Sequence, residues 1–434
     1  MTDHAAAPQG ISVRYIYSAC VVIATPDIRI LSDPWFTEGV YDGSWFQFPK
    51  VDKPIELIGD VDVIYVSHLH PDHYDAKFLR QYFAAYGKKE VVIAAHTPNH
   101  LANKMRVDGF GATILQEPRQ VGKTRFEILP HKTGSSSDID SALIVKYTDA
   151  QRTHCVVNSN DIIFDDAMSS ELKGAAGEVD ILLCGYTGAG PYPQTYFDFS
   201  DAALAVQAQK KKEAFFERYR ALVKTMEAKV NVPFAGQYIL GGKLVQLNDY
   251  RGVADAVEVL PLDPHAVVLA DAGGEIDTGT LRTEAVRTKP HSVQALRQRE
   301  AEISALPMDY ERLIPLEEVH QLPIKRLLAT AARKASERSE CDHDYYFAIR
   351  ISDDESALIN ACKSPEKLIQ FVRNDATLPT PRSEIDIDVR YLFGLLTNVY
   401  HWNNAEVGSQ YNTRRFPNEL DRQAQNFLNY LAVA

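Results

Sequence analysis

A short segment rich in histidine and aspartate follows directly on a mostly apolar run. The segment is Ser67-His68-Leu69-His70-Pro71-Asp72-His73-Tyr74-Asp75, and the run before it is Val61–Val66. An apolar run of this length, rich in β-branched residues, predicts a buried strand. Pro71 restricts the backbone in the middle of the following loop. The alternatives are a solvated surface cluster, into which an apolar strand rarely leads, or a buried, hydrogen-bonded histidine cluster. The pattern therefore predicts metal ligands on a loop that leaves a buried strand.

The spacing within the segment divides these ligands between two ions. His68 and His70 alternate along the chain and can point at one ion, while Asp72 and His73 serve a second. Neutral imidazole nitrogen and carboxylate oxygen suit zinc, iron or manganese. We therefore expect two divalent metal ions, with zinc as the first expectation and iron or manganese as the alternatives.

A two-metal site needs further ligands from other strand ends, and the sequence offers two candidates. Asp161 follows the predicted strand Cys155–Asn158, and its carboxylate is a candidate bridge between both ions. A turn or helix-cap aspartate is the alternative there. His131 follows the predicted strand Glu127–Leu129 and is expected to bind the first ion, with a solvated loop histidine as the alternative.

Other acidic and histidine side chains are expected outside the direct ligand set. Asp33, at the end of another predicted strand, and Asp75 are expected to orient imidazoles through their second ring nitrogens. His96, His100 and His154 have no spacing that ties them to the site. We expect these three to be structural or surface residues.

Bulk properties limit the classes of partner. The chain has 434 residues, with 46 basic and 58 acidic side chains and a net charge of −12, which argues against nucleic acid as a general partner. Its five cysteines are scattered and form no CxxC pair, which favours a reducing compartment. Residues 1–10 show no signal-peptide pattern, and no stretch approaches the roughly 18 apolar residues of a membrane span. We expect a cytoplasmic protein of unspecified oligomeric state that acts on a small molecule, without a membrane partner.

The order of predicted elements indicates a layered α/β sandwich, because strands alternate first with hairpins and then with helices. The longest predicted helix covers 200–230, with Ser200 as its cap. A polar, glycine-rich stretch at 271–290 is typical of a linker or of an excursion from the core. We expect a metal-binding core over residues 1–260. Residues 261–434 then form a C-terminal α+β extension, either a lid on the active site or a separate domain.

The segment Ser67–Asp75, with Asp33-Pro34-Trp35 upstream, resembles the HxHxDH motif of the metallo-β-lactamase superfamily. This resemblance implies an αββα sandwich. Within the superfamily, the chain is most similar to the metal-binding part of the CMP-N-acetylneuraminate hydroxylase family. The similar stretches run in order over nearly the whole chain and are Ile64–His73, Asp140–Tyr147, Asn158–Asp161, Gly188–Pro193, Pro233–Gly236 and Trp402–Gly408 with Arg414.

Two departures from the resemblance bear on the chemistry. The hydroxylase carries a Rieske iron–sulfur domain, and the full set of paired Cys and His ligands for such a cluster is absent from this chain. Many superfamily hydrolases also place a histidine ligand late in the core, where this chain has Pro233–Tyr238 without a histidine. The second ion is therefore expected to be less fully ligated, unless His401 substitutes.

The first functional hypothesis is a metal-dependent hydrolase in which Asp72 orients the metal-activated water or takes its proton. Lys243, after Gly241-Gly242, and Arg414 are expected to bind the substrate. The resemblance implies a phosphorylated or nucleotide-linked sugar, or a similar small ester. The alternatives are an iron-dependent oxygenase of a nucleotide sugar with a separate electron-donor protein, and a non-catalytic scaffold that binds a ligand.

Overall fold

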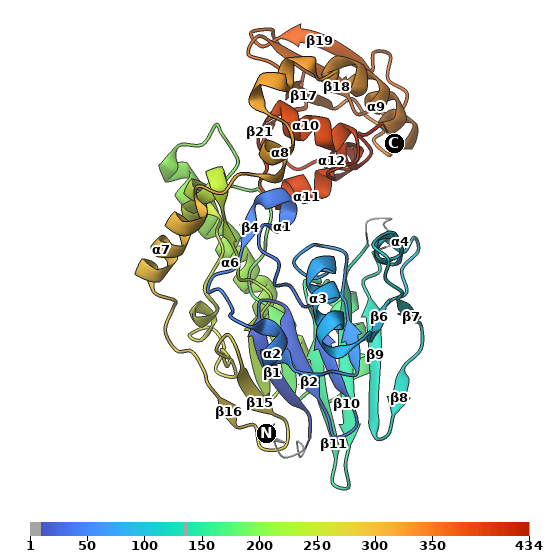
Figure 1. The fold of residues 1–434 in the computed structure, drawn as a ribbon, viewed down its shortest axis with the longest axis vertical. Coiled ribbons are helices and arrows are strands. Elements are labelled where there is room, and N and C mark those ends of the chain that lie inside the picture. Colours follow the sequence, from blue (N-terminus) through green and yellow to red (C-terminus); the bar gives the residue numbers. More distant parts are fainter. Residues whose placement is uncertain (1–9, 134–137, 434) are drawn as a thin grey trace.

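Two β-sheets packed face to face form the N-terminal part of the chain (Figure 1). The computed structural model describes residues 10–133 and 138–433. In the first sheet, β1, β2 and β3 are antiparallel neighbours and β3, β5, β6 and β7 are parallel. The spatial order of this sheet is β16 (Thr283–Glu284), β15 (Gly274–Asp277), β1 (Ser12–Tyr17), β2 (Cys20–Ala24), β3 (Arg29–Ser32), β5 (Val63–Tyr65), β6 (Glu90–Ala94) and β7 (Thr113–Leu115).

The second sheet is antiparallel at one end and parallel at the other. β8 to β11 pair antiparallel, and β11, β12 and β13 pair parallel. Its spatial order is β13 (Val230–Phe234), β12 (Ile181–Gly185), β11 (Thr153–Asn158), β10 (Ser141–Thr148), β9 (Thr124–Pro130) and β8 (Arg119–Val121). The parallel end of each sheet carries the strand that leads into a predicted metal ligand.

The alternation of side chains along each strand explains why this sheet is buried on both faces. On β12, Leu183 packs into the core between the two sheets, whereas Leu182 and Cys184 pack on the outer face. Helices α5 (Asp166–Ala176) and α6 (Asp201–Met226) cover that outer face. Strands buried on both faces are apolar throughout, as the sequence of β12 is.

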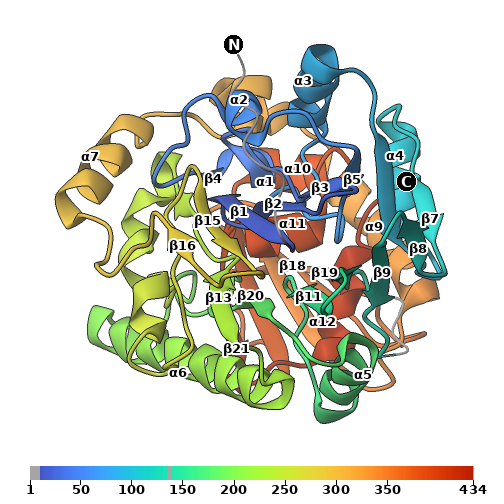
Figure 2. The ribbon, with the colours of Figure 1, turned by 90° about the horizontal axis from the view of Figure 1, so that it is seen from below.

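A helix on the opposite side completes the sandwich. α3 (Ala76–Tyr86) covers the outer face of the first sheet through Phe78, Leu79 and Tyr82, which share a core with Ile64 on β5. Figure 2 shows α3 and α6 on opposite sides of the molecule, with strands between them. The αββα sandwich expected from the sequence is confirmed. α6 also has the predicted cap, since Ser200 Oγ accepts a hydrogen bond from Ala203 N at 3.3 Å.

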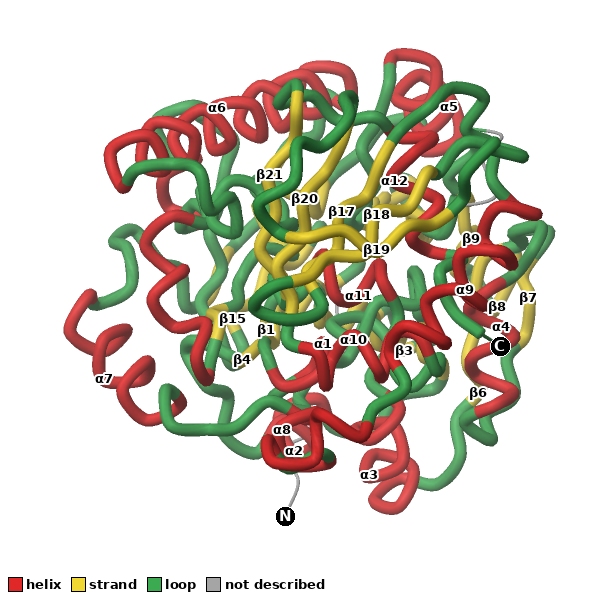
Figure 3. Tube along the Cα trace, turned by 90° about the horizontal axis from the view of Figure 1, so that it is seen from above, coloured by secondary structure: helices red, strands yellow, loops and turns green. Residues whose placement is uncertain are grey.

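The C-terminal part forms a separate five-stranded sheet with its own helices. Its spatial order is β19 (Ile369–Arg373), β18 (Glu355–Asn360), β17 (Tyr346–Arg350), β20 (Arg382–Ile387) and β21 (Tyr411–Phe416). The helices that pack with it are α9 (Ile324–Arg338), α10 (Val389–Leu396), α11 (Trp402–Val407) and α12 (Arg422–Asn429). Figure 1 and Figure 3 show this sheet across one end of the sandwich.

The two parts of the chain share one apolar core. It includes Ile64 of the first sheet and Phe347 of the C-terminal sheet. Tyr391 Oη donates to Asp42 Oδ2 at 2.6 Å, which fixes α10 against α1 (Val40–Gly43).

The remaining elements connect these layers and are α2 (Pro54–Ile58), α4 (His100–Val107), α7 (Val293–Ile303), α8 (Asp309–Leu313), the pair β4 (Trp45–Phe46) and β14 (Ile239–Leu240), and the 3-10 helices η1 (Gly242–Tyr250), η2 (Ala256–Val259) and η3 (Leu316–Gln321).

The stretch at 271–290 is not a linker, which corrects one expectation. It contains β15 and β16, and β15 pairs antiparallel with β1 so that Ile276 lies opposite Val13. The glycine-rich composition comes from the turns around a short edge strand. The boundary expected at residue 260 stays a prediction, although the first sheet continues beyond it. In the described part of the chain, every helix is too short or too polar to cross a bilayer.

Replacing a core leucine tests the packing of the two sheets. Leu183→Ala is expected to lower the free energy of unfolding by about 2–5 kcal/mol, because this side chain is fully buried between the sheets. Val206→Ala, on the exposed side of α6, is the control and is expected to change it by less than about 0.5 kcal/mol. Chemical denaturation followed by circular dichroism measures both. Equal midpoints for Leu183→Ala and wild type would contradict this packing.

Candidate metal centre

The histidine-rich loop begins where β5 ends and is fixed to the strands on either side of it. Ser67 N donates to Asp33 Oδ1 at 2.8 Å, and Ser141 Oγ donates to Ser67 O at 2.8 Å. Further on, His73 N and Tyr74 N both donate to His70 O, which closes the loop into a tight turn. These backbone contacts place the side chains of the loop with little freedom.

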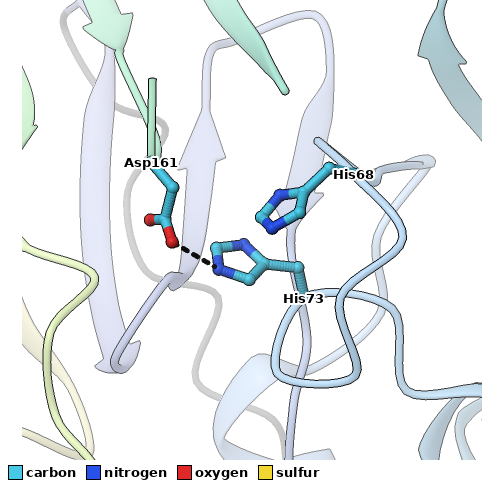
Figure 4. Close-up of side chains that lie close together, drawn as sticks. All are labelled: His68, His73 and Asp161. Atoms are coloured by element: carbon cyan, nitrogen blue, oxygen red, sulfur yellow. Dashed lines mark ion pairs between the residues drawn. The ribbon is translucent and has the colours of Figure 1, made fainter. Parts of the chain in front are cut away.

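The imidazoles of the loop lie against one another and against two carboxylates. His68 Nε2 and His70 Nδ1 are 2.8 Å apart. His73 Nε2 lies 3.3 Å from Asp161 Oδ2 and 3.5 Å from Asp72 Oδ2. Figure 4 shows the imidazoles of His68 and His73 side by side, with the Asp161 carboxylate reaching His73. The structure therefore brings together the five predicted ligands of the loop and of the end of β11.

Three of these residues could together hold a single ion. One ligand atom each from His68, His73 and Asp161 lies within 4.8 Å of the other two. Both imidazoles are buried, whereas Asp161 is exposed. Buried nitrogens facing one accessible carboxylate are typical of an ion site that opens onto a cavity.

Asp33 and Ser67 both contact Nδ1 of the His73 ring. Asp33 Oδ2 is 3.2 Å from His73 Nδ1, and Ser67 Oγ lies 3.3 Å from the same nitrogen and 2.9 Å from His68 Nδ1. A carboxylate on the far nitrogen of a metal-binding imidazole fixes its orientation and tautomer. Asp33 thus lies where the sequence predicts it.

The electrostatics of the cluster favour a bound cation. Burial lowers the pKa of His68 well below its ordinary value, and His73 and His70 lower it further, so His68 is neutral and able to donate a lone pair. Burial also opposes a charge on His73, but Asp161 and Asp72 together raise its pKa well above its ordinary value. In the protein alone, a proton on His73 balances these carboxylates. A divalent ion would supply that charge instead, and the donor set fits zinc, iron or manganese.

Three residues that the sequence analysis did not select also belong to the cluster. Asp140 Oδ1, on the loop before β10, is 3.6 Å from His68 Nδ1. Tyr41 Oη, from α1, donates to Asp72 Oδ1 at 2.5 Å. Asn403 Oδ1, from α11, lies 2.8 Å from His70 Nε2. Asp140 and Asn403 fall within stretches that carried the family resemblance, which is the only signal that pointed to them. Tyr41 lies in an aromatic-rich segment, Trp35–Phe48, which is a candidate wall of the pocket.

The Asn403 contact determines the protonation of His70. An amide oxygen only accepts hydrogen bonds, so His70 Nε2 must carry the hydrogen that it donates to Asn403. The lone pair of His70 is then on Nδ1, the nitrogen that faces His68 Nε2. A residue of the C-terminal part therefore prepares His70 for metal binding.

Asp75 has a different place from the one expected. Its carboxylate accepts hydrogen bonds from Phe36 N at 3.1 Å, Thr37 N at 2.6 Å and Phe78 N at 2.9 Å. It therefore caps α3 and holds the loop after β3, and no contact with an imidazole is recorded for it among the described residues. The reason is local, since an aspartate directly before a helix finds free N–H groups there.

The backbone of His131 and the ring of His401 each make a local hydrogen bond. His131 N donates to Asp140 O at 2.8 Å, but its imidazole is not in the group of converging ligand atoms within the described residues. Its role as a ligand stays a prediction. His401 Nδ1 accepts a hydrogen bond from Asn403 N at 3.2 Å and so caps α11. Its substitution for a late ligand stays a prediction.

Neither of the two cations expected to bind substrate faces the cluster. Lys243 Nζ lies 3.2 Å from Glu311 Oε1 and 4.9 Å from the Tyr310 ring centroid. Arg414 Nε donates to Glu384 Oε2 at 2.7 Å. Both are paired within the C-terminal half, so their placement does not favour a role in substrate binding.

A cavity of about 340 Å³ opens beside the cluster. His70, Asp72, Asp140 and Asp161 line one wall, and residues 188–190 with part of α6 line another. Asn160, also in the lining, is buried.

Comparison with known proteins gives a family match over part of the chain and several partial relatives. Residues 12–210 match the family model described as Beta-lactamase superfamily domain. A Mycobacterium tuberculosis protein named for a Rieske 2Fe-2S iron-sulfur centre is 32% identical over 251 residues, which cover 55% of this chain and 46% of that protein. The cytidine monophosphate-N-acetylneuraminic acid hydroxylase of Danio rerio is 25% identical over 241 residues, covering 52% and 38%. The chain thus spans less than half the length of these relatives.

Solved structures show a weaker likeness. The diiron beta-hydroxylase CmlA from Streptomyces venezuelae has a TM-score of 0.40 and is 15% identical, covering 62% of this chain and 54% of that chain. An isothiocyanate hydrolase from Delia radicum gut bacteria has a TM-score of 0.42 and is 14% identical, covering 61% and 98%.

Removing the amide oxygen of residue 403 tests whether the C-terminal part prepares the metal site. Asn403→Ala is expected to weaken metal binding about 10- to 100-fold, because His70 loses the partner that fixes its ring and tautomer. Asn403→Asp keeps an acceptor and is expected to retain most of the affinity. Competition with a chromogenic chelator measures the affinity.

The matched control is Asn404→Ala, the next residue of the same short helix. It is expected to bind metal like the wild-type protein. An Asn403→Ala variant that is folded and has wild-type affinity would show that Asn403 does not position His70.

Proposed function

We propose that this chain, whose residues 12–210 form a β-lactamase superfamily domain, is a metal-dependent hydrolase of a small ester. Its substrate is a phosphorylated or nucleotide-linked sugar or a compound of similar size. The observation that carries the proposal is the convergence of buried imidazoles and carboxylates on one wall of a cavity of about 340 Å³. Cavities of this size accommodate small-molecule ligands.

Six residues would hold the metal: His68, His70, Asp72, His73, Asp161 and, from the loop before β10, Asp140. When bound, divalent ions lower the pKa of a coordinated water to about 7 and polarise a substrate oxygen. Whether one ion or two are bound depends on how these donors are shared. With two ions, His68 and His70 would serve one, and Asp72 and His73 the other.

We assign to Asp72 the task of orienting the attacking water or accepting its proton. Its Oδ1 is held by the Tyr41 hydroxyl at 2.5 Å, so the carboxylate cannot rotate freely. Its Oδ2 lies 3.5 Å from His73 Nε2, on the side where the ligands converge. A carboxylate fixed in this way orients a water molecule or accepts its proton as the nucleophile forms.

A second candidate is an iron-dependent hydroxylase, and one observation favours it specifically. Asp140 lies beside His68, where His131 had been expected to complete a set of imidazoles. Sets that combine two imidazoles with a carboxylate suit iron(II) and oxygen chemistry. Relatives named for a Rieske centre and for nucleotide-sugar hydroxylation support the same candidate. Electrons would then come from a separate redox protein.

The cellular location belongs to the proposal as well. All five cysteines are free, and four of them are buried. Free thiols of this kind fit a reducing compartment, and we place the activity in the cytoplasm.

Elemental analysis of the purified protein tests the function directly. Hydrolysis is expected to come with zinc, or with manganese, and without oxygen uptake. Iron together with substrate-dependent oxygen uptake would overturn the hydrolase in favour of the hydroxylase. Protein that binds no divalent metal after reconstitution would exclude both enzymes and leave a ligand-binding scaffold.

Two substitutions test the residues. His70→Ala and Asp161→Ala are expected to lower the bound metal by about one ion per chain, because each removes a donor that faces the cavity. Asp353→Ala is the matched control, since this carboxylate is fully exposed on the C-terminal part. Unchanged metal content in both His70→Ala and Asp161→Ala would show that the site has been assigned to the wrong residues.

A further inference from the structure

We infer that Arg218 binds the anionic group of the substrate, a phosphate, on the wall of the cavity formed by α6. This inference deepens the proposed function, because it names the residue and the chemical class that this cavity recognises. The cations predicted for that task, Lys243 and Arg414, are paired elsewhere. Arg218 is assigned from its position, its charge and its lack of a competing partner.

The position of Arg218 follows from the helical repeat of α6. Phe215, Arg218, Leu222 and Thr225 are spaced by three or four residues, lie on one side of the helix and line the cavity. The neighbouring Tyr219 is buried against the second sheet, so the helix cannot turn to present another side. Arg218 therefore faces the same space as His70, Asp72 and Asp161.

The charge of Arg218 is unusual in its surroundings. Among the described residues that line the cavity, it is the one cation, and the other charged groups apart from histidine are aspartates. Within the described part of the chain, no ion pair joins it to a carboxylate, whereas its neighbours Lys212 and Arg220 pair with Glu258 and Glu217. A guanidinium without a carboxylate partner keeps its N–H donors free for an oxyanion, which it binds in bidentate geometry.

An aromatic ring packs against the guanidinium of Arg218. The Arg218 Cζ atom lies 4.9 Å from the centroid of the Phe215 ring, within the range of a cation–π contact. The ring itself packs on the backbone at Gly188, where a Cβ atom would come within 2.0 Å of Phe215 Cζ. The absence of a side chain at residue 188 thus allows Phe215 to lie where it orients Arg218.

This arrangement divides the cavity into two functional walls. The acidic wall, His70 with Asp72, Asp140 and Asp161, repels a phosphate unless metal ions are bound to it. The α6 wall attracts the phosphate through Arg218. A phosphate-bearing substrate held there extends its reacting group toward the metal wall, so binding and chemistry use different residues.

Titration with inorganic phosphate tests the assignment. Arg218→Gln is expected to weaken phosphate binding about tenfold or more, because a charge-assisted bidentate contact is lost. Arg220→Gln is the matched control on the same helix and is expected to bind within about twofold of wild type. Gly188→Ala is expected to weaken binding severalfold by displacing Phe215 while leaving Arg218 in place. Calorimetry or ³¹P NMR measures the affinity, with metal content determined on every sample.

The outcomes separate this inference from the proposed function. Phosphate affinity of Arg218→Gln within twofold of wild type, or a wild-type protein that binds no phosphate, would overturn the role of Arg218. The same titration on chelator-treated protein is expected to show weaker phosphate binding overall, because the acidic wall then repels the anion, but to keep the difference between wild type and Arg218→Gln. If wild-type protein holds no metal yet shows that difference, the metalloenzyme proposal fails and the phosphate site stands.

Discussion

The carboxylate of Asp33 is the contact on which the metal centre depends. It is fully buried, and it accepts a hydrogen bond from Ser67 N while its other oxygen lies 3.2 Å from His73 Nδ1. A buried carboxylate is costly unless such partners satisfy it. One side chain at the end of β3 therefore fixes both the start of the loop and the ring at its far end. The imidazoles are positioned before any ion binds.

The C-terminal part completes the site rather than standing apart from it. Asn403 reaches His70, and Gln410 Nε2 donates at 2.8 Å to the backbone oxygen of Tyr41, the residue whose hydroxyl holds Asp72. A single apolar core runs through both parts of the chain. Destabilising the C-terminal part is therefore expected to disturb the metal centre, because Tyr41 and His70 each have a hydrogen-bond partner in that part.

The sequence shows ligand types clearly where the chemistry is contiguous, but it does not show which partners a side chain finds in the folded chain. Ser67–Asp75 and Asp161 were identified because strand ends and ligand types are visible in the sequence, and the structure brings these residues together. Asp75 was assigned to an imidazole but caps α3 instead. Lys243 and Arg414 looked available, yet tertiary carboxylates pair with both. A pattern shows which group is present and not which neighbour satisfies it.

The sequence by itself determined the layered α/β fold and the loop that carries the ligands, because apolar periodicity and residue spacing act over short distances. Only the tertiary structure decided that Asp140 accompanies His68, that Asn403 sets the tautomer of His70, and that Arg218 faces the cavity. Asn403 is 333 residues from His70 along the chain. Such contacts depend on how whole layers pack, and no local spacing encodes them.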